Sequence, residues 1–114
     1  MDVWKKAIDF VTVVYRATES FPREERFGLT SQIRRAAVSI PANIAEGAAR
    51  DSKKEFLYFL SNAQGSASEL ETELLIAQKL GYLAEREYIS MRDELDSIGR
   101  MIIGLSQKIK KTIT

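Results

Sequence analysis

Apolar residues recur three or four positions apart along nearly the whole chain, a spacing that places them on one side of an α-helix. Only two prolines and six glycines interrupt the pattern. The clearest stretch runs from Tyr88 to Ile109, where steps of three and four alternate as in a coiled-coil seam. The spacing therefore predicts an all-α protein.

The first predicted helix carries an apolar face from Trp4 to Thr18, and Pro22 separates it from the next helix. The second is predicted over residues 30–46, with Gly47 in the left-handed conformation that ends a helix. Pro41 lies inside it and deletes the hydrogen bond to the Ala37 carbonyl, so we expect a bend or another donor there.

The third predicted helix begins after Ser52, whose spacing to Glu55 is typical of a capping box, and runs about 29 residues to Gly81. Gly65 costs about 1 kcal/mol relative to alanine inside a helix, so we expect a neighbouring backbone to pack closely against it. A fourth helix follows Leu83. Short connections favour one antiparallel up-down-up-down four-helix bundle over residues 1–114.

The first, second and fourth helices carry more apolar surface than an isolated four-helix bundle buries. On the second helix the spare surface is a strip of small residues: Val38, Ala42, Ala45 and Ala49. Uncovered apolar patches above a few hundred Å² usually mark an interface, so we expect self-association. The alternative is that these residues are scattered singly over a monomer surface.

A polar stripe lies beside the core stripe of the second helix and consists of Gln32, Ser39, Asn43 and Glu46. Buried polar groups need partners, which Arg35 on the same helix and Gln64, Ser66 or Ser68 on the third helix offer. We interpret the stripe as a structural network that fixes the register of helices or subunits. A ligand pocket is the alternative.

The sequence offers little catalytic chemistry. It has no cysteine and no histidine, which excludes thiol nucleophiles, imidazole catalysis and Cys/His zinc sites. Its glycines are too far apart for a phosphate-binding loop. Glu69 and Glu73 share a helix face while Glu71 points elsewhere, which favours a solvated or ion-paired surface over a metal site. We therefore expect a protein that has no enzymatic activity and binds no cofactor or metal.

Charge is distributed unevenly although the net charge is only +1. Residues 69–96 carry a net charge of −5 and the remaining residues +6. Lys108, Lys110 and Lys111 have an ordinary explanation, because cations at a helix C-terminus offset the helix dipole. Lys53 and Lys54 begin a helix, where positive charge is mildly unfavourable, so either a bound anion or simple solvation explains them.

The chain has no apolar run of about 18 residues and no signal-peptide pattern at its start. We therefore expect a cytoplasmic protein with no membrane partner.

Residues 32–47 read Gln-Ile-Arg-Arg-Ala-Ala-Val-Ser-Ile-Pro-Ala-Asn-Ile-Ala-Glu-Gly. This stretch resembles the hallmark of the bacterial 23S rRNA intervening-sequence protein family. Flanking motifs also match: Trp4 with Lys5-Lys6-Ala7, Phe21-Pro22, Phe27-Gly28-Leu29, Gly65-Ser66-Ala67 and Leu80-Gly81-Tyr82-Leu83. The resemblance implies an antiparallel four-helix bundle that assembles as a homopentameric ring without enzymatic activity. Relatives include accessory proteins of diversity-generating retroelements, basic pentamers that bind reverse transcriptase and RNA.

Pattern and resemblance together give two hypotheses. In the first, a non-enzymatic pentamer binds RNA or DNA through basic residues repeated around the ring. The candidate residues are Arg34, Arg35, Arg50, Lys53 and Lys54. In the second, the assembly is a scaffold that binds a reverse transcriptase or another protein without contacting nucleic acid.

Overall fold

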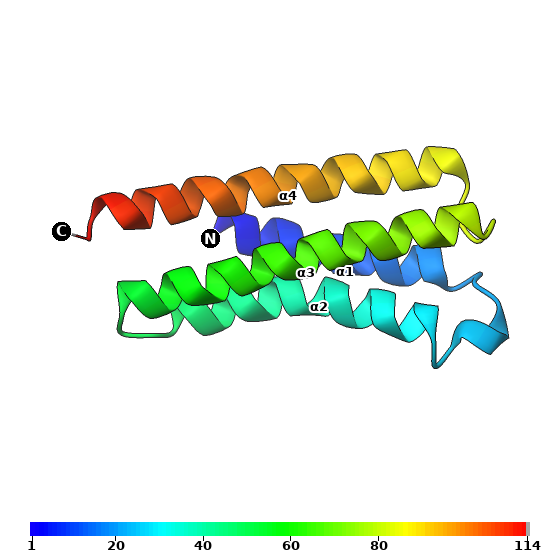
Figure 1. Ribbon diagram of the computed structural model, residues 1–114, viewed down its shortest axis with the longest axis horizontal. Helices are drawn as coiled ribbons and strands as arrows, with labels where there is room; N and C mark the ends of the chain where they lie inside the picture. The colour runs from blue at the N-terminus through cyan, green and yellow to red at the C-terminus, as the bar shows by residue number, and fades with distance from the viewer. Residues whose placement is uncertain (114) are drawn as a thin grey trace.

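The computed structural model describes residues 1–113. It contains α1 (Asp2–Thr18), a short 3₁₀ helix η1 (Arg23–Glu25), α2 (Leu29–Ala48), α3 (Lys53–Lys79) and α4 (Glu85–Lys111). Figure 1 shows the four long helices side by side in a body of about 50 × 25 × 19 Å. No strand occurs in the described residues, so the all-α prediction is confirmed.

The four helices share one apolar core. α2 packs most extensively against α3, while α1 contacts α2 and α3 contacts α4 over smaller areas; the contact of α1 with α4 is the smallest. The largest fully buried side chains come from all four helices: Phe10, Val14, Ile33, Ile40, Ile44, Leu60, Leu70, Leu74, Ile98 and Ile102. On α2 and α4 the three-and-four spacing therefore identified the core positions.

On α1 the buried face is rotated from the predicted one. Val3 and Phe10 lie in the core, whereas Trp4 and Ile8 are 37% and 40% exposed. Both sets have helical spacing, so periodicity alone did not separate the buried face from the neighbouring one.

Both ends of α3 have local causes. At its start, the Ser52 Oγ accepts a hydrogen bond from the Glu55 backbone N–H at 3.3 Å, as predicted. At its end, Gly81 adopts a φ of 83°, which favours glycine because a Cβ there would lie too close to a backbone carbonyl oxygen. The Tyr82 N–H donates to the Ala77 carbonyl at 2.9 Å and the Gly81 N–H to the Gln78 carbonyl at 3.0 Å. These bonds form a Schellman motif that satisfies the last carbonyls of α3.

The prediction that Gly47 ends α2 in a left-handed conformation is wrong. α2 continues to Ala48, and Gly47 is buried inside it. A Cβ at this position would lie 2.9 Å from both Phe56 Cδ1 and Phe59 Cβ, and 3.2 Å from the Phe56 carbonyl oxygen. Gly47 is therefore required because α3 approaches the α2 backbone closely, and the turn between the helices needs no left-handed residue.

Gly65 shows the opposite situation. It is exposed, and a Cβ built there would meet no atom of the chain within 4 Å. The predicted close packing is therefore absent within a single chain. Pro41 is buried, and α2 remains helical across it.

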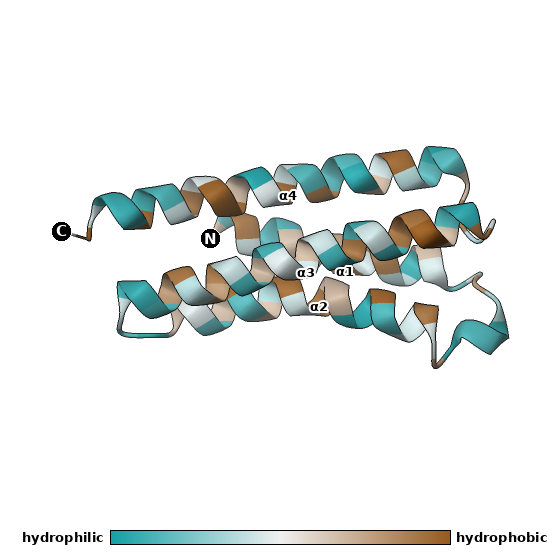
Figure 2. Ribbon diagram, in the orientation of Figure 1, coloured by the Kyte–Doolittle hydropathy of each residue, from teal (hydrophilic) through white to brown (hydrophobic). Residues whose placement is uncertain are grey.

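Considerable apolar surface remains uncovered on this single chain. Val38 is 42% exposed, and the small residues Ala42, Ala45 and Ala49 lie on the same exposed side of α2. Further exposed apolar side chains are Trp4, Ile8, Val13, Leu75, Ile76, Leu80, Ile89 and Ile103. Figure 2 shows apolar and polar residues alternating along the ribbons, with a strongly apolar stretch toward the C-terminal end of α3.

Candidate nucleic-acid interface

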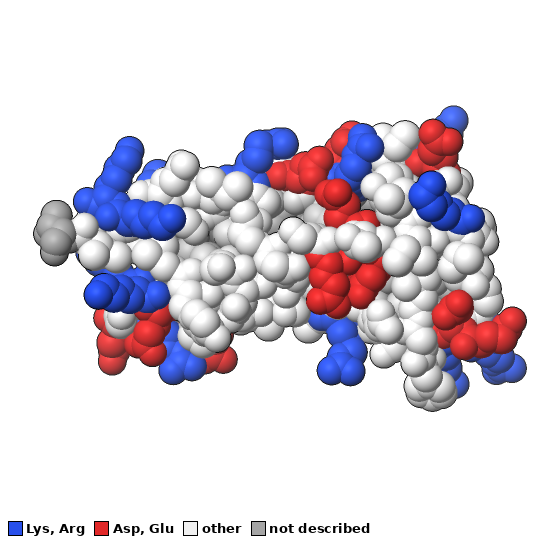
Figure 3. All heavy atoms as spheres, in the orientation of Figure 1, with Lys and Arg blue, Asp and Glu red and all other residues white. Residues whose placement is uncertain are grey.

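Basic residues from two helices gather at one end of the molecule. The turn between α2 and α3 lies at the same end as the C-terminus of α4 (Figure 1). Six exposed cations belong to this end, which we call the basic end: Arg50, Lys53, Lys54, Lys108, Lys110 and Lys111. Together with Glu46, Asp51 and Glu55, these residues carry a net charge of +3. Figure 3 shows a group of blue side chains at this end with red ones below them, and both colours in the middle and at the opposite end.

Arg50 is the most constrained cation of the basic end. Its Nη2 lies 2.9 Å from Glu46 Oε2, one helical turn away, and its guanidinium lies 5.0 Å from the centre of the Phe59 ring. An exposed ion pair of this kind contributes little stability, but together with the ring it limits where the guanidinium points. Lys53 and Lys54 are exposed in the first turn of α3.

Arg34 does not belong to the basic end. Its Nε donates to Thr18 Oγ1 at 2.8 Å, its Nη2 donates to the Tyr15 carbonyl at 3.2 Å, and it stacks 4.5 Å from the centre of the Tyr15 ring. These bonds join α2 to the last turn of α1, where a cation also offsets the helix dipole. Arg35, the next residue of α2, is exposed and lies about 22 Å along the helix axis from Arg50. The five predicted residues therefore form two separate groups.

The polar stripe of α2 forms a smaller network than predicted. Ser39 Oγ lies 2.8 Å from Ser66 Oγ across the contact between α2 and α3, and Asn43 Nδ2 donates to the Ser39 carbonyl and Oγ at 2.8 and 2.9 Å. Gln32 lies outside this network and is exposed. Glu46 pairs with Arg50 instead of Arg35, because the shorter step along the helix brings Arg50 beside it.

Glu73 was expected on a solvated or ion-paired surface, and this expectation is wrong. It faces the interior with 6% of its surface exposed, and its Oε1 has no hydrogen-bond partner in the part of the chain that the structure describes. Burial, followed by the hydrogen bond and charge of Glu69 one turn away, raises the pKa of Glu73 to about 7. The shared face of Glu69 and Glu73 was predicted correctly, but the depth of that face was not.

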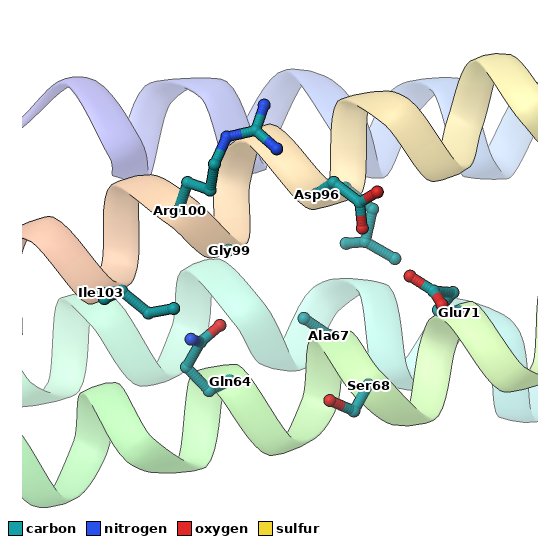
Figure 4. A pocket seen from close by; sticks show the side chains of 9 residues that line it. Gln64, Ala67, Ser68, Glu71, Asp96, Gly99, Arg100 and Ile103 are labelled. Atoms are coloured by element: carbon teal, nitrogen blue, oxygen red, sulfur yellow. The ribbon is translucent and has the colours of Figure 1, made fainter.

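A second carboxyl pair lies between α3 and α4. Glu71 and Asp96 line a hollow of about 270 Å³ together with Gln64, Ser68 and Arg100. Figure 4 shows Gln64 and Glu71 extending from α3 and Asp96 from α4, whereas the Arg100 side chain extends away from α3. Partial burial, followed by the nearby charge of Asp96, raises the pKa of Glu71. The described residues contain no group of three or more potential metal ligands.

A family model described as the 23S rRNA-intervening sequence protein matches residues 1–104. The chain belongs to this family. A solved structure of a protein of unknown function from the S23 ribosomal protein family of Bacteroides thetaiotaomicron is also similar. It is 26% identical, the alignment covers 91% of this chain and 97% of that chain, and the TM-score is 0.82. A comparison with curated proteins finds no match. The resemblance proposed from residues 32–47 is therefore confirmed.

The residues that resemble the hallmark of the 23S rRNA-intervening sequence protein family lie on α2, where they supply core contacts, the Ser39 network and the close approach at Gly47. Sequence reasoning missed that the last turn of α4 lies at the same end as the start of α3. The predicted order of the helices already contained this signal, because a fourth helix that returns along the third ends near the beginning of the third.

None of the described helices is both long and apolar enough to span a bilayer.

Proposed function

We propose that this antiparallel four-helix bundle is a non-enzymatic accessory protein that assembles as a homopentamer and binds RNA through the basic end. The observation that carries the proposal is the segregation of charge: the basic end has a net charge of +3, whereas residues 69–96 have −5. Phosphate backbones attract clustered cations regardless of base sequence. A near-neutral chain acquires such a cluster only by separating its charges.

A ring strengthens a weak local patch. One basic end offers a few phosphate contacts, but five copies on one assembly bind a single strand as a multivalent surface. The 23S rRNA-intervening sequence family name supports RNA as the nucleic acid, and the exposed positions of Lys53 and Lys54 leave both ammonium groups accessible to phosphates.

Uncovered apolar surface supports self-association. The small-residue strip of α2 permits close approach of another helix, and it is exposed in the single chain. Gly65 is a glycine inside an exposed helix turn with open space around it, and the chain alone offers no compensation for its helix penalty. A neighbouring copy over these surfaces accounts for both features.

The oligomeric state tests the ring. In size-exclusion chromatography with light scattering, we expect the mass of five chains. Ala45→Arg is expected to reduce the mass, because it places a long charged side chain on the small-residue strip. Gln107→Arg adds the same charge at an exposed position of α4 and is expected to leave the mass unchanged. A single chain at micromolar concentration contradicts self-association, and another multiple contradicts the pentamer.

RNA binding is tested by charge reversal. We expect Lys53→Glu with Lys54→Glu to weaken binding of a single-stranded RNA by about tenfold and to reduce its salt dependence, measured by fluorescence anisotropy. The fold is expected to persist, because glutamates at a helix N-terminus are favourable for the helix dipole.

Lys79→Glu with Arg86→Glu is the matched control, since it makes the same charge change outside the basic end. Equal weakening by both double variants shows that net charge alone matters and contradicts an interface at the basic end. Absence of RNA binding by the unaltered protein contradicts the proposal.

A protein scaffold is the second candidate, and two exposed apolar side chains favour it. Phe27 is 90% exposed and Leu80 55% exposed, near the end opposite the basic end. Aromatic side chains exposed to this extent are typical of contacts with other proteins. This function predicts that Phe27→Ser abolishes the binding of a protein partner and leaves RNA binding unchanged.

A further inference from the structure

The connection between α1 and α2 borders a hollow of about 410 Å³. Three arginines line it: Arg23 and Arg26 from the connection and Arg34 from α2. We call it the arginine hollow. It lies at the end opposite the basic end, where η1 and the start of α2 meet (Figure 1).

The three guanidinium groups are not neutralised by ion pairs. The ion pairs within residues 1–113 are Arg50 with Glu46 and Arg92 with Asp93, so none involves the arginine hollow. Glu19 also lines the hollow, which leaves three cations facing one carboxylate among its described lining residues. η1 also carries Glu24 and Glu25, neither of which lines the hollow. Glu25 accepts hydrogen bonds from the Leu29 N–H at 3.1 Å and the Tyr82 hydroxyl at 3.0 Å.

Arg34 is held in place independently of any ligand. Its Nε and Nη2 bond to α1, as described above, so its guanidinium is oriented before an anion arrives. Thr30 lines the same hollow, is 8% exposed, and its hydroxyl has no hydrogen-bond partner among the described residues. A buried hydroxyl without a partner is costly, and an oxyanion in the hollow would supply one.

We propose that the arginine hollow binds the phosphate group of a small molecule. Guanidinium groups bind phosphate oxygens through paired, charge-assisted hydrogen bonds, and the start of α2 adds the positive end of a helix dipole. The turn between α3 and α4 packs against this connection through the Phe21 and Tyr82 rings, whose centres are 5.4 Å apart. Residues 69–96, which include this turn, carry a net charge of −5 and repel a polyanion, so a long nucleic-acid strand is disfavoured there.

The direct test is calorimetric titration of the full chain with inorganic phosphate, adenosine 5′-monophosphate and adenosine. We expect heat of binding for phosphate and the nucleotide and none for adenosine. Backbone amide shifts in NMR are expected to locate the binding at residues 18–34. No binding of either phosphate compound, or equal binding of adenosine, overturns the proposal.

Two variants separate the site from net charge. Arg23→Gln with Arg26→Gln is expected to weaken phosphate binding about tenfold, because each loses a charge-assisted contact. Arg86→Gln with Arg100→Gln removes the same charge from α4 and is expected to change the affinity less than about twofold. Equal weakening by both pairs overturns the proposal.

Thr30→Val and two RNA probes complete the test. The valine variant is expected to raise the melting temperature without phosphate, by removing an unsatisfied hydroxyl, and to weaken phosphate binding. An unchanged phosphate affinity overturns the role of Thr30. The two RNA probes are a 5′-phosphorylated RNA and its 5′-hydroxyl form. The assignment to a small molecule is overturned if the phosphorylated RNA binds more tightly, if Arg23→Gln with Arg26→Gln removes this difference, and if the mononucleotide does not bind.

Discussion

Glu73→Gln is expected to stabilise the protein by about 2 kcal/mol at about pH 8 and to have little effect at about pH 4. The pKa of Glu73 is raised from 4.5 to about 7, so the folded state holds a proton more tightly than the unfolded state. The contribution of this group to stability is therefore complete below pH 4.5 and is lost as the pH rises through 7. Glutamine cannot ionise and removes that loss, and its amide can donate to Glu69.

Urea unfolding followed by circular dichroism measures the effect, at one protein concentration so that assembly does not vary. Glu94→Gln makes the same substitution at an exposed position of α4 and is expected to change stability by less than about 0.5 kcal/mol at either pH. If the difference in the free energy of unfolding between Glu73→Gln and the unaltered protein is the same at both pH values, ionisation of Glu73 does not destabilise the folded state.

Gly47→Ala is expected to destabilise the protein by about 2 kcal/mol, although alanine is the better helix former by about 1 kcal/mol. The new methyl group would lie 2.9 Å from Phe59 Cβ and 3.2 Å from the Phe56 carbonyl oxygen. Neither atom can move without the backbone of α3, so α2 and α3 must separate along their most extensive contact.

Gly104→Ala is the matched control. Gly104 is also inside a helix, and a Cβ there would meet no atom within 4 Å, so alanine is expected to stabilise by up to about 1 kcal/mol. Opposite signs for the two glycine variants in urea unfolding support the close approach. Stabilisation by both shows that Gly47 is not a packing requirement.

The comparison of Gly47 with Gly81 shows what sequence alone provides. Both glycines follow a predicted helix, and both were predicted to end it. Only Gly81 adopts the left-handed conformation, whereas Gly47 lies within the helix. The helices and the core depend on local spacing and were predictable from the sequence. The role of Gly47 depends on Phe56 and Phe59, which lie on another helix. It was not predictable because local spacing does not determine how closely two helices approach.

The candidate site shows the same division. Arg50, Lys53 and Lys54 are neighbours in sequence and remain neighbours in space. Arg34 was grouped with them because of its charge, but its hydrogen bonds join it to Thr18 and Tyr15 of α1. Glu69 and Glu73 are the same residue type on the same face of the helix. Only the packing of α3 against its neighbours determines that the Glu73 carboxyl is buried. Tertiary contacts thus determine which cations lie together and which carboxyl is buried, and residue type alone does not.

The separation of charge along the 50 Å long axis gives the molecule an electric dipole moment in addition to its small net charge. A polyanion exerts a torque on such a body, which turns the lysine-rich tip toward it before any contact forms. Rotation about a single symmetry axis preserves the component of each protomer's dipole along that axis. These components therefore add, and the two rims of a ring would differ in electrostatic potential whenever the long axes incline toward its symmetry axis.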